Sequence, residues 1–332
     1  MRIAFHSNQL CERGTEIALY DYAHFNEVLL KNDSIVFARK GNKNNKTPVI
    51  EKFRNRFKVY LYQDIKELEQ LLKKESIDVF YAIKSGENDG IISKHCKTVI
   101  HCVFTTLEPH GNVYGCISNN LNNRFKTNCP VVPHMVHLPD IQGDLRDKLG
   151  IPKDTIVFGS YGAYDNFNLE FVHNAIKRLI HNRKDIYFIF MNIRSFYRSW
   201  LGQSHKQLIH LPASINLEDK VRFINTCDAM IHARGDGETF GLSIAEFSLK
   251  NKPVITYKPL HGKEKIYYND AHLEILGDKA IIYSDEDELF SVLNNYNPEF
   301  NRQRFASVYS SDYNPEAVMY LFESLFLKGT GK

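Results

Sequence analysis

Short apolar runs alternate with amphipathic segments along the first half of the chain. The runs are rich in β-branched and aromatic residues and predict strands, which read RIAFHS, SIVFAR, KVYLY, IDVFYAI and TVIHCVF. The amphipathic segments predict helices over residues 15–30 and 65–74. Such alternation is typical of a parallel sheet covered by helices on both faces.

The same pattern starts again near residue 150. After the turn in LGIPKDTIVFGSYG, further strands are predicted at DIYFIFMN, DAMIHA and KPVITY, and helices over residues 169–181, 217–226 and 241–249. Two α/β units in series are the simplest account. A last helix over residues 315–327 has an apolar stripe and must pack on one of the units.

Length and composition agree with two globular domains. The chain has 332 residues, and a domain usually has roughly 100 to 200. Apolar residues make up 43% and charged residues 24%, as in soluble proteins. The net charge of +3 comes from 42 basic and 39 acidic residues spread along the chain, so no cationic face predicts nucleic-acid binding.

We expect a cytoplasmic protein. The sequence has no apolar run of about 18 residues and no signal-peptide core, which predicts no transmembrane segment and leaves peripheral contact with a membrane open. Its six cysteines form no CxxC pair and predict reduced thiols, so we expect no structural metal.

The segment RGDGETFGLSIAEFSLK is the strongest candidate for a site. It follows the strand DAMIHA and leads through a glycine-bearing loop into a helix. The backbone N–H groups of Phe240, Gly241 and Leu242 would lie at the positive end of that helix, where a phosphate can bind. Glu238 and Glu246 would bracket a ligand there by accepting hydrogen bonds from its hydroxyl groups. Alternatively, Glu238 only complements the helix dipole and Glu246 is exposed, although the apolar neighbours of Glu246 predict a buried acid with a partner.

The run GETFGLSIAEFSLKNKPVIT resembles the E-x-F-G-L-x-x-x-E motif of retaining glycosyltransferases of the GT-B fold, family four. Three weaker similarities accompany it: PVVPHMVHLPD with LRDKLGIPKDTIVFGSYG, then LEDKVRFINTCDAMIHA, and RGTEIALYDYA near the N-terminus. Together they cover nearly the whole chain. The glutamate motif is the specific one.

The resemblance implies two Rossmann-like, doubly wound parallel-sheet domains in the GT-B arrangement. Residues 1–150 would bind the acceptor, residues 151–312 would bind a nucleotide-sugar donor, and residues 313–332 would form a helix that packs on the first domain. The implied reaction transfers a sugar from a nucleotide-diphosphate sugar to a hydroxyl of a glycan, lipid or small molecule, with retention of configuration and without a cofactor or metal.

The resemblance also implies roles for single residues of the donor domain. Glu238 would contact the hydroxyl groups of the donor sugar and take part in catalysis, and Glu246 would bind the ribose. Phe240, Gly241 and Leu242 would donate backbone hydrogen bonds to the diphosphate.

On the acceptor side, His101 in the strand TVIHCVF resembles the family histidine that faces the anomeric carbon, although a strand histidine is more often a core residue. Gly14 resembles the family's flexible glycine loop near the donor phosphates, and an ordinary strand-to-helix turn is the alternative. The loop after the His101 strand would bind the acceptor through Thr105, Thr106, His110 and Tyr114.

The sequence departs from the family after the first donor-domain strand. Ala163 and Asn168 stand where most members have an arginine and a lysine that neutralise the leaving diphosphate. We favour replacement by other cations, namely Arg194, Arg198 or Arg234.

Two further explanations stay open for this departure. One is a divalent metal at residues 285–287, an Asp-Glu-Asp string that is better suited to capping a helix. Alternatively, the chain has lost catalysis and is a silent nucleotide-sugar-binding protein. A nucleotide-sugar 2-epimerase of the same architecture is a third functional class.

Overall fold

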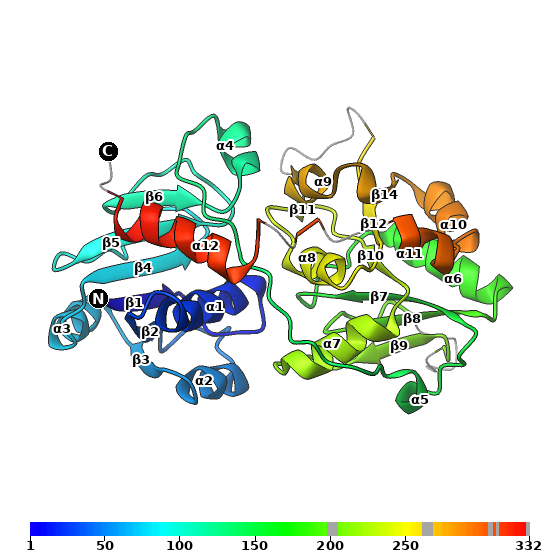
Figure 1. Ribbon diagram of the computed structural model, residues 1–332, viewed down its shortest axis with the longest axis horizontal. Helices are drawn as coiled ribbons and strands as arrows, with labels where there is room; N and C mark the ends of the chain where they lie inside the picture. The colour runs from blue at the N-terminus through cyan, green and yellow to red at the C-terminus, as the bar shows by residue number, and fades with distance from the viewer. Residues whose placement is uncertain (198–204, 261–267, 305–307, 310–311, 330–332) are drawn as a thin grey trace. The chain divides into compact units, whose positions relative to one another are not determined.

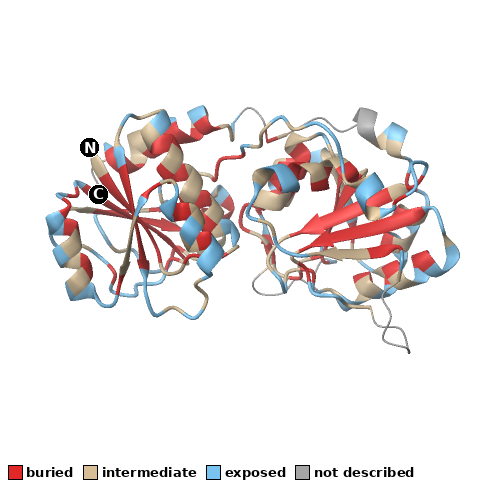
Figure 2. Ribbon diagram, turned by 90° about the horizontal axis from the view of Figure 1, so that it is seen from below, coloured by how far each residue is buried: buried red, intermediate tan, exposed pale blue. Residues whose placement is uncertain are grey.

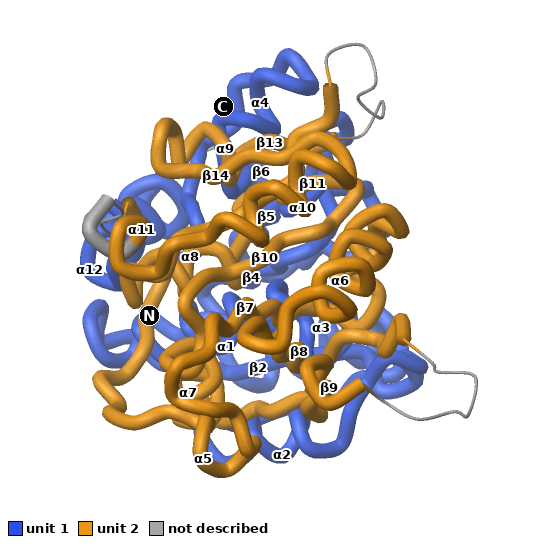
Figure 3. Tube along the Cα trace, turned by 90° about the vertical axis from the view of Figure 1, so that its right-hand side faces the viewer, with its two compact units in different colours: residues 1–135, 311–332 blue, residues 136–310 orange. Residues whose placement is uncertain are grey.

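The computed structural model describes residues 1–197, 205–260, 268–304, 308–309 and 312–329 (Figure 1). The chain forms two compact units, which Figure 3 colours separately. Unit 1 comprises Met1–Met135 and Ser311–Lys332, and unit 2 comprises Val136–Ser310. None of the helices within the described residues has the length and apolar character needed to cross a membrane.

Unit 1 contains a six-stranded sheet in which all neighbouring strands are parallel. The strand order is β3-β2-β1-β4-β5-β6, so the direction of winding reverses between β1 and β4. The strands are β1 (Arg2–Ser7), β2 (Asp33–Arg39), β3 (Lys58–Tyr62), β4 (Val79–Lys84), β5 (Lys97–Cys102) and β6 (Val113–Cys116). The helices between them are α1 (Gly14–Val28), α2 (Thr47–Arg54) and α3 (Ile65–Lys74), and α4 (Asn119–Phe125) follows β6.

Unit 2 repeats this topology with the order β14-β12-β10-β7-β8-β9, and its winding reverses between β7 and β10. The strands are β7 (Ile156–Tyr161), β8 (Ile186–Met191), β9 (Leu208–Leu211), β10 (Ala229–His232), β12 (Val254–Tyr257) and β14 (Ala280–Tyr283), with a separate parallel pair, β11 (Gly237–Glu238) and β13 (Asn269–Asp270). The helices are α5 (Arg146–Leu149), α6 (Glu170–Asn182), α7 (Leu217–Thr226), α8 (Leu242–Leu249), α9 (Ala271–Leu276), α10 (Glu286–Asn294) and α11 (Pro298–Arg304), with a 3-10 turn η1 (Gly277–Lys279). The predicted fold class, two doubly wound parallel sheets, is confirmed.

Burial explains why the central strands were visible in the sequence. Every residue of β4 and of β8 is buried, because helices cover both faces of each sheet (Figure 2). The strands β6, β9 and β14 were not predicted. Each has only four residues and lies at a sheet edge, and β9 and β14 are mostly half-buried, so their apolar signal is weak.

The C-terminal helix α12 (Pro315–Leu321) and the π-helical segment η2 (Phe322–Leu327) pack within unit 1. Phe322 is fully buried, with its ring 5.2 Å from that of Tyr22 and 5.1 Å from that of Tyr81. A side chain at Gly115 would have its Cβ 2.4 Å from the Phe326 ring, so glycine in β6 is what lets this ring approach.

Residues 136–150, which we expected in the first domain, belong to unit 2. Arg146 in α5 forms an ion pair of 3.0 Å with Asp228 just before β10, and the Leu145 N–H donates to Thr226 Oγ1 over 2.8 Å. These bonds attach the connecting segment to unit 2 before β7 begins. Compact unit 2 therefore begins before residue 151, and the boundary of the donor-binding domain stays a prediction.

We expect Phe322→Ala to lower the free energy of unfolding of the full chain by about 3–5 kcal/mol, because it removes a fully buried ring and leaves a cavity against Tyr22 and Tyr81. Urea denaturation measures the change. The matched control is Tyr320→Ala in the adjoining helix α12, where the side chain is 71% exposed and the change should stay within about 0.5 kcal/mol. Equal effects of the two substitutions would contradict the packing of this helix.

Candidate functional site

The glutamate segment lies at the carboxyl edge of the unit 2 sheet. Strand β10 ends at His232, and Glu238 follows in β11, which pairs with β13, before α8 begins at Leu242. Winding of the sheet reverses between β7 and β10, and in open parallel sheets ligands bind beyond the carboxyl ends of strands at that place. The loop after β10 is therefore where a ligand of unit 2 is expected.

Two glycines shape this loop. At Gly237, which has φ +64°, a Cβ would lie 1.9 Å from the Asn269 carbonyl oxygen, so only glycine permits the pairing of β11 with β13. Gly241, with φ +88°, is the N-cap of α8. Its left-handed conformation turns the chain from β11 into the helix.

The N-terminus of α8 is open to a ligand. No side chain caps it, and its first internal hydrogen bond runs from the Ala245 N–H to the Gly241 carbonyl over 2.9 Å. Among the described residues no acceptor is bonded to the N–H groups of Leu242, Ser243 and Ile244. Because helix α8 begins at Leu242, these three amides take the place that we expected for those of Phe240, Gly241 and Leu242. The Phe240 ring is buried and packs against Tyr309, 5.8 Å away.

Glu238 is a mostly buried carboxylate held by two partners. Its Oε2 accepts a hydrogen bond from Arg234 Nη1 at 2.8 Å, and its Oε1 lies 3.3 Å from His232 Nε2. Burial alone would raise the pKa of Glu238, but the Arg234 charge and the His232 hydrogen bond outweigh it and lower this pKa to about 2. Glu238 therefore stays ionised at neutral pH.

A second layer of hydrogen bonds fixes His232. Its Nδ1 lies 2.9 Å from Thr256 Oγ1, which in turn lies 3.1 Å from Nε2 of His272. His232, Thr256 and His272 are all buried. The Glu238 carboxylate is thus positioned from the ends of β10 and β12 together.

Glu246 is buried and its charge is already compensated. Its Oε1 is 2.7 Å from Lys220 Nζ in α7, and its Oε2 accepts a hydrogen bond from the hydroxyl of Tyr161 at the end of β7. The side chains of Lys220 and Glu246 are only 8% and 6% exposed. The sequence analysis predicted a buried acid with a partner here, and it missed the partner, Lys220.

The loop after β7 shows what Asn168 does in place of a cation. Asn168 Oδ1 accepts a hydrogen bond of 2.8 Å from the Gly235 N–H, and its own N–H donates to the Ala233 carbonyl over 3.0 Å. Asn168 therefore ties the loop after β7, which contains Ala163, to the loop after β10. A lysine would lack the amide oxygen that accepts the first of these bonds.

The candidate cations differ in their surroundings. Arg194 lies beside the loop after β7, and its guanidinium pairs with Asp165 at 2.8 Å, with both side chains largely exposed. Arg234 is more buried and contacts Glu238 directly. Arg198 lies outside the described residues. Asp285, considered above for a metal, caps α10 by accepting a hydrogen bond of 2.9 Å from the Glu288 N–H, and the described residues contain no group of three potential metal ligands.

His101 lies in the core of unit 1. The ring has no exposed surface, its Nδ1 is 2.7 Å from the Tyr81 hydroxyl, and its Nε2 is 2.8 Å from the Val132 carbonyl oxygen. Burial holds the pKa of His101 well below its usual value, so the ring is neutral. These are the surroundings of a core histidine, and the catalytic role stays a prediction that this environment does not favour.

The residues expected to bind the acceptor lie between β5 and β6. Tyr114 in β6 donates a hydrogen bond of 2.6 Å to the Gly86 carbonyl and contacts the Thr105 carbonyl at 3.4 Å. Thr106 is fully buried and bonded to Thr127, while His110 Nδ1 lies 2.7 Å from the Glu108 carbonyl. The structure thus brings Thr105 and Tyr114 together but turns Thr106 inward.

The loop that ends at Gly14 contains a buried acid that the sequence analysis missed. Glu16, in the first turn of α1, is 1% exposed and accepts hydrogen bonds from Ser7 Oγ at 2.8 Å and Cys11 Sγ at 3.2 Å. Burial raises the pKa of Glu16, and this effect outweighs the opposing effects of the two hydrogen bonds and the Arg13 charge. The resulting pKa is about 7. The sequence feature that could have indicated Glu16 was its place in the first helical turn after the first strand.

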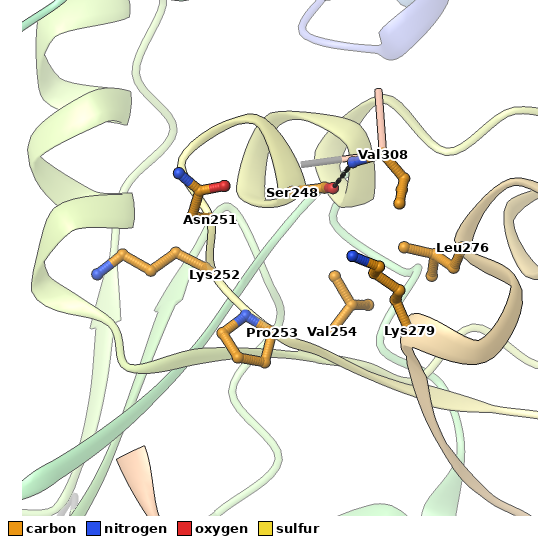
Figure 4. A pocket seen from close by; sticks show the side chains of 8 residues that line it. All are labelled: Ser248, Asn251, Lys252, Pro253, Val254, Leu276, Lys279 and Val308. Atoms are coloured by element: carbon orange, nitrogen blue, oxygen red, sulfur yellow. Dashed lines mark hydrogen bonds between the residues drawn. The ribbon is translucent and has the colours of Figure 1, made fainter. Parts of the chain in front are cut away.

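A small pocket lies at the other end of α8 (Figure 4). Ser248, Lys252, Leu276 and Lys279 are among its lining residues, and Ser248 Oγ accepts a hydrogen bond of 3.3 Å from the Val308 N–H. It contains none of the predicted site residues. We therefore place the candidate site at the N-terminus of α8.

We expect Lys220→Met to lower the free energy of unfolding by about 3–5 kcal/mol, because it leaves the Glu246 charge buried without its cation. The control is Arg222→Met on the same helix, whose ion pair with Glu218 is exposed and whose loss should cost at most about 1 kcal/mol. If urea denaturation gives both variants the same stability, Lys220 does not neutralise Glu246.

Glu16 makes stability depend on pH. Its pKa is about 7 in the folded chain against 4.5 for the free side chain, so the folded state binds the extra proton and stability falls as pH rises between these values. The loss amounts to about 3 kcal/mol by pH 8. We expect Glu16→Gln to remove this decline in denaturation curves measured from pH 4.5 to 8, whereas Glu12→Gln on the same loop should keep it. A parallel decline in wild type and Glu16→Gln would contradict the assignment.

Known proteins were compared with the whole chain. Neither a model of a protein family nor a curated protein matches the sequence. Solved structures do match. HepE of Anabaena in complex with UDP-glucose is 14% identical, with a TM-score of 0.73 over 98% of this chain and 99% of that one. A glycosyltransferase from Rickettsia africae is 12% identical (TM-score 0.68; 98% and 97% covered), and a putative UDP-N-acetylglucosamine 2-epimerase from Listeria monocytogenes is 11% identical (TM-score 0.58; 99% and 97% covered). At such identities the likeness establishes the architecture, and this chain has the GT-B fold.

Proposed function

We propose that the chain is a retaining glycosyltransferase that transfers a sugar from a UDP-sugar to an acceptor hydroxyl. The observation that carries the proposal is the open N-terminus of α8 beside the ionised Glu238, at the carboxyl edge of the unit 2 sheet. The likeness to a protein crystallised with UDP-glucose supports the choice of nucleotide.

In this proposal the diphosphate binds at the N-terminus of α8. The amides of Leu242, Ser243 and Ile244 are unused donors at the positive end of a helix dipole, which suits an anion. Gly241 presents no side chain to obstruct the approach of a phosphate to this turn. Arg234 adds a positive charge next to Glu238 and replaces the cations missing at Ala163 and Asn168.

The two glutamates would hold the sugar parts of the donor. Glu238 is ionised and fixed by His232 and Arg234, and it accepts hydrogen bonds from hydroxyl groups of the transferred sugar. Its negative charge stabilises the positive charge that develops at the anomeric carbon of this sugar. Glu246 accepts from the ribose. A carboxylate can accept about four hydrogen bonds, and Lys220 and Tyr161 use one on each oxygen.

The remaining roles follow the resemblance to retaining enzymes. The departing diphosphate assists the attacking acceptor hydroxyl on the same face, so no residue of the chain has to form a covalent bond to the sugar. The acceptor would bind in unit 1 near Thr105, His110 and Tyr114.

Epimerisation of a UDP-sugar is the second candidate, favoured by the likeness to the Listeria putative 2-epimerase. The two reactions separate in one experiment. A transferase leaves the configuration of the UDP-sugar unchanged when no acceptor is present, whereas an epimerase converts it, as NMR of the nucleotide sugar would show. A chain that binds UDP but does neither is the silent binding protein.

Calorimetry with UDP, UDP-glucose, GDP and ADP tests the nucleotide directly. We expect UDP to bind at least about tenfold more tightly than GDP and ADP. Failure of all these nucleotides to bind would contradict the proposed function as a whole.

The substitute cation can be identified by a matched pair of variants. We expect Arg234→Gln to lower kcat of the transfer reaction about a hundredfold, because it removes the cation that the proposal assigns to the leaving diphosphate. Arg194→Gln should leave kcat within about twofold, since that arginine is exposed and paired with Asp165. The reverse order of the two effects would make Arg194 the cation.

A further inference from the structure

The carboxyl edge of the unit 1 sheet also carries a polar cluster where winding reverses, between β1 and β4. The register pairs His6 with Ala82, so that Asn8 and Lys84, two positions further on, are level with each other. It pairs Ser7 with Ala38 as well, which brings Arg39 level with Asn8. Neighbours in a parallel sheet share a face, so these side chains form one row.

Lys84 is charged and almost fully buried in this row. Its side chain is 2% exposed, and its Nζ lies 2.5 Å from Asp89 Oδ1. Asp89 also accepts hydrogen bonds of 3.1 Å from Asn8 Nδ2 and from the Ile91 N–H. The carboxylate is thus satisfied by three donors, while Lys84 has two further N–H groups.

Two buried polar atoms beside this pair have no partner among the described residues: His6 Nδ1 and Asn8 Oδ1. His6 is fully buried and bonded only through Nε2, to the Tyr62 hydroxyl at 2.8 Å. Asn8 donates to a carboxylate through Nδ2, so its free atom must be the acceptor oxygen. Leaving such atoms unpaired is unfavourable, which favours a bound polar ligand.

Arg39 supplies a second positive charge. It is exposed at the end of β2, and within the described residues its guanidinium forms no ion pair. Burial is the largest cause that lowers the pKa of His6. The charges of Lys84 and Arg39 lower it further, to about 3, although the Asp89 charge opposes them. Both cations therefore act on the same neutral ring.

The loop after β1 is held in a fixed shape around this cluster. Asparagines of the loop after β2 bond to it one after another: Asn42 Nδ2 donates to the Asn8 carbonyl at 2.9 Å, and Asn45 Oδ1 accepts from the Leu10 N–H at 2.9 Å. Asn44 Nδ2 donates to Gln9 Oε1 at 3.1 Å. A site held in this way loses little entropy when it binds a ligand.

We propose that this edge of unit 1 binds the anionic group, a phosphate or a carboxylate, of a substrate that also carries hydroxyl groups. Arg39 and the free N–H groups of Lys84 bind the anion, and Asn8 Oδ1 accepts a hydrogen bond from a hydroxyl. Asp89 lies in the same row, but Lys84 compensates its charge. The charge of Arg39 therefore makes the cluster net positive. Resting on the proposed function, the inference makes the acceptor an anionic sugar or polyol.

The test compares Arg39→Gln with Lys40→Gln in the full chain. Lys40 is the adjacent exposed cation, loses the same charge and lies outside the row. Calorimetry with glucose 1-phosphate, glucuronate and uncharged glucose should show that the anions bind and glucose does not. Arg39→Gln should weaken anion binding about tenfold or more, and Lys40→Gln less than about twofold.

Titration of the same variants with UDP identifies the source of the anion. Unchanged UDP affinity in Arg39→Gln assigns the site to the acceptor, and a matching loss of UDP affinity assigns it to the diphosphate of the donor. The proposal is overturned if wild type binds neither anion, or if Arg39→Gln and Lys40→Gln behave alike. UDP binding by wild type would in that case leave the proposed function standing.

Discussion

Neutralisation of two buried carboxylates is the constraint on which the rest of unit 2 depends. A buried charge that lacks a partner costs a large share of the whole stability of a domain, so Glu238 and Glu246 require partners. Arg234 and His232 hold the first, and Lys220 and Tyr161 hold the second. The partners of Glu238 come from β10 and the loop after it. Those of Glu246 come from α7 and β7, so its charge fixes how α8 lies on the sheet.

At the strand ends, the uncharged amide side chains of asparagines connect neighbouring loops. Asn168 connects the loops after β7 and β10, and Asn42 and Asn45 hold the loop after β1. A side-chain amide both donates and accepts hydrogen bonds, so it can join two backbone segments without adding charge. Asn168, which stands where the family that the sequence resembles has a lysine, thus makes a connection within the fold.

The sequence predicted what depends on continuous local signals. Buried strands such as β4 and β8 are long apolar runs, and Glu238 and Glu246 stand in a specific motif. Partners from distant segments were out of reach. Lys220 lies in an amphipathic helix where a lysine usually faces solvent, and only the tertiary fold shows that it is buried beside Glu246.

The boundary between the units depends on long-range bonds that cannot be recognised in the sequence. The ion pair of Arg146 with Asp228 joins residues far apart in the chain, and no local pattern around residue 146 indicates it. Histidines that look alike in the sequence also differ in their surroundings in the fold. His101 lies in the core of unit 1, while His232 positions a carboxylate.

The chain order of the C-terminal helix has a consequence for biosynthesis. Residues that cover Tyr22 and Tyr81 come after all of unit 2, so a ribosome makes them only after unit 2. Unit 2 is contiguous and can finish folding during translation, whereas unit 1, though synthesised first, must wait with an aromatic surface uncovered. Until that helix has been made, the surface around Tyr22 and Tyr81 is open to chaperones and to aggregation.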